Sequence, residues 1–281
     1  MRHKTSGVWG NPRTHRWVVA LRCAGIALAA VWSLWAGRSL AAAPTLHAVS
    51  VATLPHDAQA FTQGLLYQGG YFYESTGLYG RSTIRQVIPA TGKVVAQRSL
   101  PRTIFGEGLA LAGEKLLQLS WKEGRVLVYR LTDLQPLGEF PLSGEGWGVC
   151  TMNDGRLVVS DGSNTLTFYE PSQFTKSGAL PVTDAGKPVD RLNELESIGG
   201  TIWANIWGEK RIAVIDPATG HVLAWIDCAS LFPKNLQDPS EDVLNGIAYD
   251  PATKRIWITG KFWPVIHEIT VPGLAARTKG K

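Results

Sequence analysis

The chain has 281 residues, of which 28 are Lys or Arg, 23 are Asp or Glu and 44% are hydrophobic. Residues 1–41 contain six of the basic residues and none of the acidic ones, so residues 42–281 carry 22 basic and 23 acidic side chains. This nearly neutral balance excludes the basic surface that binding to nucleic acid or anionic lipid requires.

Residues 1–41 have the order of a secretory signal peptide. Four basic residues are followed by a mostly apolar run from Cys23 to Ala36 and then by the small residues Ala41, Ala42 and Ala43. The run is too short for a membrane span, which needs about 20 residues. We therefore expect cleavage after Ala41, a single mature domain at 42–281, no membrane span after cleavage, and a periplasmic or secreted protein. An uncleaved N-terminal anchor is the alternative.

Five segments of the mature chain share one pattern, in which a variable residue precedes a position that is glycine in four cases. They are 62–66 (TQGLL), 106–110 (GEGLA), 146–150 (GWGVC), 192–196 (LNELE) and 244–248 (LNGIA). Their central positions are 44, 40, 46 and 52 residues apart. A repeat of about 40–50 residues indicates β-propeller blades.

Each repeat has the pattern of short strands separated by turns. In the second repeat we predict strands at 109–111, 116–121, 125–130 and 137–140. Four antiparallel strands per repeat are typical of a blade. The fifth repeat, 244–271, is shorter, and a lone strand predicted at 47–54 can supply its missing outer strand. We therefore predict an all-β protein, a five-bladed β-propeller closed by an N-terminal strand.

Cys150 and Cys228 remain after cleavage and have no zinc-ligand spacing. They could form a disulfide in an oxidising compartment. Burial as unpaired thiols is favoured, because Cys behaves as a small hydrophobic residue.

One mouth of the propeller tunnel should collect two sets of residues, because the first strand of a blade starts at the rim where the second strand ends. The first set is Gln63, Glu107, Trp147, Asn193 and Asn245. The second set is Gly77 or Leu78, Trp121, Asp161, Trp207 and Lys261. Indoles with a few converging polar groups are typical of a small-ligand pocket. The alternatives are that the Trp residues pack in the core, that Glu107 caps a turn, and that Lys261 is a solvated hairpin residue.

The ordered set of motifs resembles the papaya-type glutaminyl cyclases, the glutaminyl-peptide cyclotransferases of plants and bacteria. The resemblance covers residues 47–271 and rests on Phe61–Leu65, Phe105–Leu109, Leu119–Trp121, Gly146–Gly148, Leu192–Glu196, Trp203–Trp207, Leu244–Ala248 and Thr259–Lys261. It implies that N-terminal glutamine of a peptide or protein substrate is converted to pyroglutamate with release of ammonia. It also implies a reaction without a catalytic metal or other cofactor, and leaves a structural ion open.

The resemblance also implies roles for individual residues. Glu107 matches the acid/base carboxylate, and Gln63, Asn193 and Lys261 match polar active-site residues. Trp121, Trp147 and Trp207 match the aromatic pocket. We expect Phe61 and Phe105, from the same motifs, to contribute to substrate binding.

These residue types suit an internal acyl transfer, in which the α-amine attacks the γ-carboxamide carbon of the same residue. Glu107 can take a proton from the amine and return it to the departing nitrogen. Lys261, with an amide of Gln63 or Asn193, can stabilise the oxyanion, and which amide does so stays open.

Two other functions fit part of the pattern. A non-catalytic propeller that binds a peptide or sugar would need the indoles but not the carboxylate. A metal-dependent propeller lyase or lactonase would need several converging carboxylates or histidines, whereas the expected ring has one Glu, one Asp and no His. We expect the protein to be a monomer.

Overall fold

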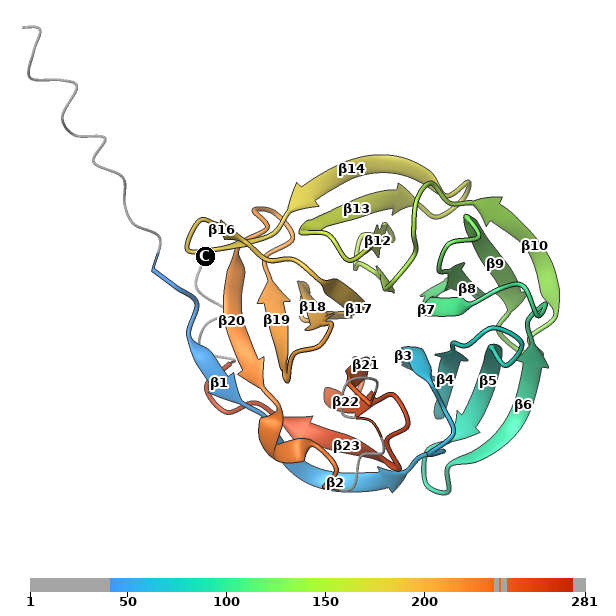
Figure 1. Cartoon of the computed structure of the whole chain (residues 1–281), viewed down its shortest axis with the longest axis horizontal. Coiled ribbons are helices and arrows are strands. Elements are labelled where there is room, and N and C mark those ends of the chain that lie inside the picture. The colour runs from blue at the N-terminus through green and yellow to red at the C-terminus, as the bar shows by residue number, and fades with distance from the viewer. Residues whose placement is uncertain (1–40, 235–237, 239–241, 275–281) are drawn as a thin grey trace, which may run out of the picture. The chain divides into compact units, whose positions relative to one another are not determined.

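The structure is a computed structural model that describes residues 41–234, 238 and 242–274. These residues form five sheets arranged around a central axis, with a small two-stranded ribbon beside them (Figure 1). The all-β, five-bladed propeller predicted from the repeats is confirmed. Among the described residues, no helix is long and apolar enough to cross a membrane.

Each blade runs from an inner strand at the axis to an outer strand at the circumference. Blade 1 consists of β3 (Thr62–Gln68), β4 (Tyr71–Thr76), β5 (Thr83–Ile88) and β6 (Lys93–Ser99). Blade 2 consists of β7 (Gly106–Ala112), β8 (Lys115–Ser120), β9 (Arg125–Arg130) and β10 (Pro136–Pro141). Blade 3 consists of β11 (Val149–Thr151), β12 (Leu157–Val159), β13 (Thr165–Glu170) and β14 (Thr175–Pro181).

The last two blades take strands from both ends of the described chain. Blade 4 consists of β17 (Leu192–Ile198), β18 (Thr201–Ile206), β19 (Arg211–Ile215), β20 (Val222–Asp227) and β1 (Thr45–His47). Blade 5 consists of β21 (Leu244–Asp250), β22 (Arg255–Gly260), β23 (Val265–Thr270) and β2 (Val49–Pro55). The ribbon is β15 (Thr183–Asp184) and β16 (Lys187–Pro188), and a 3-10 turn, η1 (Ala229–Leu231), follows β20.

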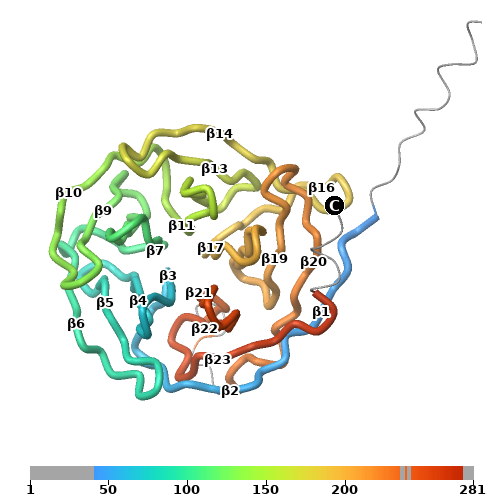
Figure 2. Tube along the Cα trace, turned by 180° about the vertical axis from the view of Figure 1, so that it is seen from behind, coloured from blue at the N-terminus to red at the C-terminus, as the bar shows by residue number. Residues whose placement is uncertain are grey.

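The N-terminal segment lies outside two neighbouring blades. β2 is antiparallel to β23 and forms the outer strand of blade 5. β1 is parallel to β20 and extends the edge of blade 4. Figure 2 shows both strands on the circumference of the ring. The sequence predicted the strand that became β2, but it gave no indication of the parallel pairing of β1.

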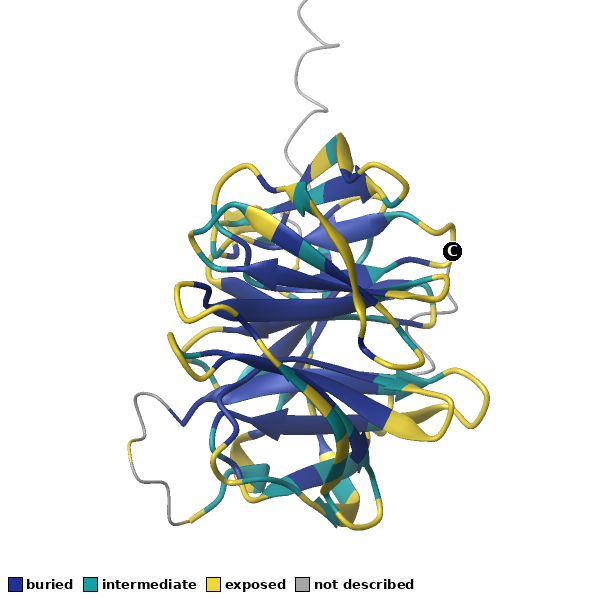
Figure 3. Ribbon diagram, turned by 90° about the vertical axis from the view of Figure 1, so that its right-hand side faces the viewer, coloured by how far each residue is buried: buried dark blue, intermediate teal, exposed yellow. Residues whose placement is uncertain are grey.

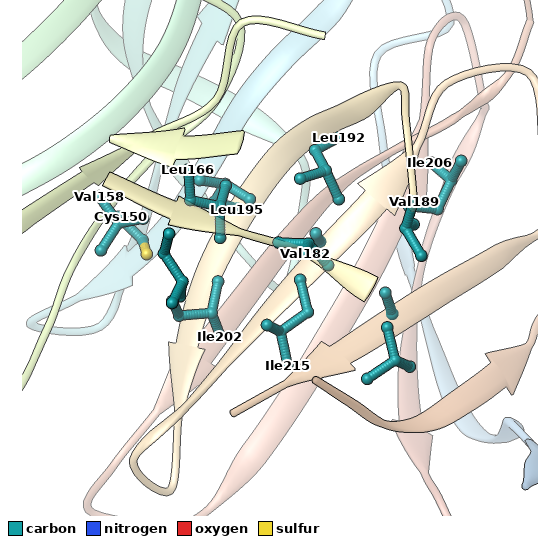
Figure 4. Close-up of a cluster of buried hydrophobic side chains, with 14 of the residues drawn as sticks. Cys150, Val158, Leu166, Val182, Val189, Leu192, Leu195, Ile202, Ile206 and Ile215 are labelled. Carbon is teal, nitrogen blue, oxygen red and sulfur yellow. The ribbon is translucent and has the colours of Figure 1, made fainter. Parts of the chain in front are cut away.

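The hydrophobic core is divided into five clusters, each between two neighbouring blades. Figure 4 shows one of them, where Cys150 and Leu166 of blade 3 pack near Leu195 and Ile202 of blade 4. Cys228 lies in the next cluster, so the two thiols are buried and unpaired, as favoured from the sequence. Because the inner strands are covered on both faces, they are almost wholly buried, whereas exposure rises toward the outer strands and loops (Figure 3).

A buried ionic network joins blade 1 to blade 5 next to Thr62, the first residue of β3. The Glu74 carboxylate accepts hydrogen bonds from Arg85 Nε (2.8 Å) and Thr62 Oγ1 (2.7 Å), and contacts His56 Nε2 at 3.0 Å. The other nitrogen of His56 lies 2.6 Å from the Trp263 carbonyl of blade 5. Burial opposes ionisation of Glu74, but Arg85 and His56 outweigh it and lower its pKa to about 2. The network therefore fixes the strand that begins next to Gln63.

Candidate active site

Irregular β-pairing marks the site on the inner strands of four blades. The register between first and second strands shifts after Thr62, Gly106, Leu192 and Leu244. A bulge leaves an extra residue unpaired and changes the direction of its side chain. In these blades the shift falls at the variable residue of the repeat: Gln63, Glu107, Asn193 and Asn245. These four polar side chains therefore depart from the regular alternation of side-chain direction along the inner strands.

The bulges also change which residues are neighbours across the blade. The sequence placed Glu107 beside Trp121, but the residue opposite Trp121 is Phe105, whose carbonyl accepts the Trp121 N–H at 3.0 Å. In blade 4, Trp207 N–H likewise bonds to Arg191 O at 2.9 Å, two residues before Asn193. The tight turns between first and second strands fix this register. In the four bulged blades the pairing is therefore displaced by two residues from the one expected.

Glycine beside the bulges of blades 1 and 2 allows neighbouring inner strands to approach closely. A Cβ atom on Gly64 would lie 2.5 Å from Leu109 N, and one on Gly108 would lie 2.7 Å from Val149 N. Real Cβ atoms do not come so near to backbone, so only glycine fits. These contacts agree with the interpretation of the repeat glycines as sites of tight packing near the axis.

The fourth repeat has Glu194 where the others have glycine, and its side chain spans the ring. Its two carboxylate oxygens accept hydrogen bonds from Leu65 N (3.3 Å) and Ile247 N (2.9 Å). One residue of blade 4 is thereby tied to the inner strands of blades 1 and 5. Burial raises the pKa of Glu194 well above its usual range, and the backbone donors only partly oppose this.

Three bulge side chains form a hydrogen-bonded chain at the site. Asn245 Nδ2 donates to Gln63 Oε1 at 3.1 Å, and Gln63 Nε2 donates to Glu107 Oε1 at 2.9 Å. Asn245 is also anchored by donating to the Thr62 carbonyl at 2.9 Å. Glu107 is 5% exposed and its partner is a side chain of the neighbouring blade, which argues against the alternative that it caps a turn.

Lys261 lies beside this chain and is 5% exposed, which rules out the solvated-hairpin alternative. It follows β22, and the next residue, Phe262, donates its N–H to Ala60 O at 2.7 Å. This contact holds Lys261 Nζ over the Phe61 ring, 4.3 Å from its centroid. Burial raises the pKa of Glu107 well above its usual range, and the positive charge of Lys261 opposes that rise.

Aromatic side chains continue from this polar group around the mouth. We call Phe61, Phe105, Trp121, Trp147 and Trp207 the aromatic belt. Phe105 contacts Phe61 and Trp121 edge to face, at centroid distances of 6.0 and 5.5 Å. Trp147 and Trp207 form a second such pair at 6.2 Å. All five residues are those expected to bind substrate, and they come from blades 1 to 4.

The exposure of the indoles distinguishes the belt from the core. Trp203, Trp257 and Trp263 are fully buried, whereas Trp207 is 44% exposed. Trp121 and Trp147 are partly exposed. The alternative that the belt indoles serve only as core packing therefore does not hold for Trp207. The partly exposed rings of Trp121, Trp147 and Trp207 are available to a ligand at this mouth.

Asn193 is the expected site residue that stands apart in its contacts. It is buried at the bulge of β17, and its backbone carbonyl oxygen accepts a hydrogen bond from Ser160 Oγ at 2.6 Å. Its position in the repeat is equivalent to that of Gln63 and Glu107. The hydrogen-bonded chain described above runs through Asn245 instead, which the sequence placed on the rim without a role.

Two further carboxylates at this mouth were not predicted from the sequence. Glu145 Oε2 accepts hydrogen bonds from both Trp121 Nε1 (2.8 Å) and Trp147 Nε1 (3.0 Å). Glu123 accepts one from Tyr79 OH at 2.8 Å. Both add to the rise in the pKa of Glu107. They lie in loops outside the repeat motif, and the only signal for Glu145 is its place two residues before a belt Trp.

Across the part of the chain that the structure describes, no group of three or more His, Cys, Asp or Glu side chains is placed to hold a metal ion.

Comparisons with known proteins agree with this geometry. The sequence profile of the glutamine cyclotransferase family matches residues 21–271. A glutaminyl-peptide cyclotransferase of Arabidopsis thaliana is 40% identical over 253 residues, which are 88% of this chain and 78% of the plant protein. The crystal structure of Myxococcus xanthus glutaminyl cyclase superposes with a TM-score of 0.77 and 41% identity, covering 82% of this chain and 98% of the bacterial one. The chain belongs to the glutamine cyclotransferase family.

Proposed function

We propose that the protein is a glutaminyl-peptide cyclotransferase that converts the N-terminal glutamine of peptides or proteins to pyroglutamate and ammonia. Family membership and the relatives of that activity support the proposal. The observation that carries it is Glu107, a buried carboxyl group held by Gln63 near Lys261 at the mouth lined by the aromatic belt.

The reaction joins two groups of one residue, so positioning accounts for much of the catalysis. The α-amino nitrogen forms a bond to the γ-carboxamide carbon, and the bond from that carbon to the amide nitrogen breaks. The side chain has to fold back on the backbone amine for this to occur. Good orientation of such intramolecular partners can lower a barrier by about 7–11 kcal/mol. We assign this task to the aromatic belt, whose ring faces suit the methylene groups of the glutaminyl side chain.

Glu107 is suited to move the proton that the reaction transfers. The α-amine loses a proton as it attacks, and the leaving nitrogen gains one as it departs as ammonia. Gln63 Nε2 donates to Glu107 Oε1, which leaves Oε2 to take and return this proton. Burial raises the pKa of Glu107, which brings its acid and base forms nearer in free energy at neutral pH. General acid/base catalysis of this kind contributes about 10²–10⁴-fold.

The tetrahedral intermediate carries a negative charge on the former carbonyl oxygen. We assign its stabilisation to Lys261, a buried cation close enough to Glu107 to oppose the rise in its pKa. An amide N–H of Gln63 or Asn193 is the second candidate donor. Because Gln63 Nε2 is engaged by Glu107, Asn193 has the more available amide for this role. Loss of one such donor costs about 10²–10³-fold in kcat.

The test is an assay of the purified protein with Gln-Ala and with a longer peptide that begins with glutamine. Ammonia release, together with loss of one ammonia from the peptide mass, supports the proposal. A parallel incubation with EDTA should leave the rate unchanged, since we assign no step to a metal. Binding of the peptide without ammonia release would instead support the non-catalytic peptide-binding alternative.

We also propose that the protein is exported and works as a monomer in the periplasm or outside the cell. The basic, apolar and small-residue order of residues 1–41 supports export, although residues 1–40 lie outside the described residues. N-terminal sequencing of protein recovered from an export-competent host should begin at Ala42. Light scattering of that protein should give the mass of one chain.

A further inference from the structure

Glu145 lies between two indoles that come from different blades. Trp121 follows β8 in blade 2, whereas Trp147 precedes β11 in blade 3. A single oxygen, Glu145 Oε2, accepts the indole N–H of Trp121 at 2.8 Å and that of Trp147 at 3.0 Å. Hydrogen bonds to a charged acceptor are about twice as strong as neutral ones. One carboxylate therefore fixes the directions of both rings.

The position of Glu145 is itself determined by the surrounding chain. The next residue, Gly146, donates its N–H to the Trp121 carbonyl at 2.9 Å. A Cβ atom on Gly146 would lie 2.7 Å from Ser120 O, so this close approach requires glycine. The second carboxylate oxygen, Oε1, lies 3.8 Å from Lys122 Nζ, which sits 3.9 Å over the Trp121 ring. The backbone next to Glu145 and both of its carboxylate oxygens therefore make contacts that fix its position.

Glu145 joins the two parts of the aromatic belt. Ring contacts connect Phe61, Phe105 and Trp121 on one side, and Trp147 and Trp207 on the other. The hydrogen bonds to Glu145 connect these two groups. They also occupy the only polar atom of each indole, so that Trp121 and Trp147 present apolar faces to a ligand.

We propose that Glu145 is a positioning residue that holds the indoles of Trp121 and Trp147 in the orientation that receives the glutaminyl side chain. The inference rests on the proposed cyclotransferase function. It predicts that loss of Glu145 weakens substrate handling, because a small misplacement of groups that orient a substrate reduces the rate.

The charge of Glu145 has a second, separable effect on Glu107. The charged side chains that act on Glu107 are Lys261, which lowers its pKa, and Glu123 and Glu145, which raise it together with burial. Removing the charge of Glu145 should therefore lower the pKa of Glu107. Since the proton transfer starts from ionised Glu107, the acid limb of kcat/KM should then move to lower pH. Because Glu145 is 40% exposed, salt should weaken this shift.

Two variants separate position from charge. Glu145→Gln keeps a carbonyl oxygen that can accept from both indoles but removes the charge. Glu145→Ala removes both. Glu139→Ala is the matched control, because Glu139 is a half-exposed carboxylate of blade 2 that pairs with Arg125 at 3.3 Å on the outer strands. Each variant is assayed with a Gln-peptide across pH, and its indole N–H resonances are followed by NMR.

We expect kcat/KM of Glu145→Ala to fall about 10- to 100-fold, mainly through KM. Glu145→Gln should stay within about threefold of wild type at its optimum, with the acid limb displaced to lower pH. The resonances of Trp121 and Trp147 should shift strongly in Glu145→Ala and moderately in Glu145→Gln, and Glu139→Ala should match wild type throughout.

Unchanged kinetics and unchanged indole resonances in Glu145→Ala would overturn the inference. Equal damage in Glu145→Gln and Glu145→Ala would also overturn it, because charge and not orientation would then be responsible. A wild-type protein without cyclotransferase activity would overturn the proposed function instead. In that case the indole resonances of Glu145→Ala, the variant that removes the acceptor, still decide whether the carboxylate orients the two rings.

Discussion

Replacement of Glu107 by glutamine tests the assigned chemistry most directly. The variant keeps the size of the side chain and an oxygen that can accept the hydrogen bond from Gln63 Nε2. It removes the group that takes and returns the proton. We expect kcat to fall about 10²–10⁴-fold, which corresponds to about 3–5 kcal/mol of activation free energy.

The same substitution should stabilise the fold, and the gain should increase with pH. Burial raises the pKa of Glu107 well above its ordinary value of 4.5, and Lys261 only partly opposes this. A group with a raised folded pKa contributes stability that is complete below its unfolded pKa and is lost as pH rises through the folded pKa. Glutamine does not ionise, so the variant does not lose this stability as the pH rises. The variant should therefore gain in Tm over wild type as the pH increases above 4.5.

The assay combines ammonia release from a Gln-peptide with thermal unfolding of both proteins at several pH values. Circular dichroism at neutral pH checks that the variant has the wild-type fold. Near-normal turnover by Glu107→Gln would refute the proton-transfer role. A variant less stable than wild type at every pH would refute the reasoning that the buried carboxylate is costly to ionise.

Three further predictions follow from the same geometry. Lys261→Met should lower kcat about 10²–10³-fold and move the acid limb of kcat/KM to higher pH, because the charge that lowers the pKa of Glu107 is lost; an unchanged pH profile would contradict this. Trp207→Ala should raise KM for the Gln-peptide about tenfold. The free energy of unfolding in urea should change by about 0.5 kcal/mol or less, since Trp207 is 44% exposed. An unfolded variant would favour a packing role. Ionised Glu74, with its pKa lowered from 4.5 to about 2, should contribute about 3 kcal/mol of stability that is present above pH 4.5 and lost as pH falls toward 2. Urea unfolding of Glu74→Gln across this range should lack that loss, and an identical pH dependence in the two proteins would argue against the ionic network.

The blade count and the site rim could be predicted from the sequence because both depend on a repeat. Gln63, Glu107 and Asn245 occupy one position of a local pattern, and strands joined by short turns must be neighbours. The hydrogen bond from Gln63 to Glu107 joins corresponding positions in adjacent repeats. Position in the repeat therefore predicted that these three side chains meet, although Asn193 at the same position stands apart from them.

Features that break the repeat could not be predicted in this way. The bulges displace the pairing of Trp121 from Glu107 to Phe105, and the pattern of residue types does not reveal the extra unpaired residue. Glu145 acts through a loop, where no periodicity indicates the direction of the side chain. Glu194 departs visibly from the glycine consensus, but only the structure shows that its carboxylate binds backbone of two other blades.

The arrangement of β1 and β2 bears on how the protein can be made. Val49 of β2 pairs with Thr270 of β23, and Thr45 of β1 pairs with Trp225 of β20, so the first two described strands wait for partners that are synthesised much later. Assembly of the ring is consequently a late step in biogenesis. A nascent chain interrupted before β23 would display β2 as an open edge, prone to pair with a second molecule.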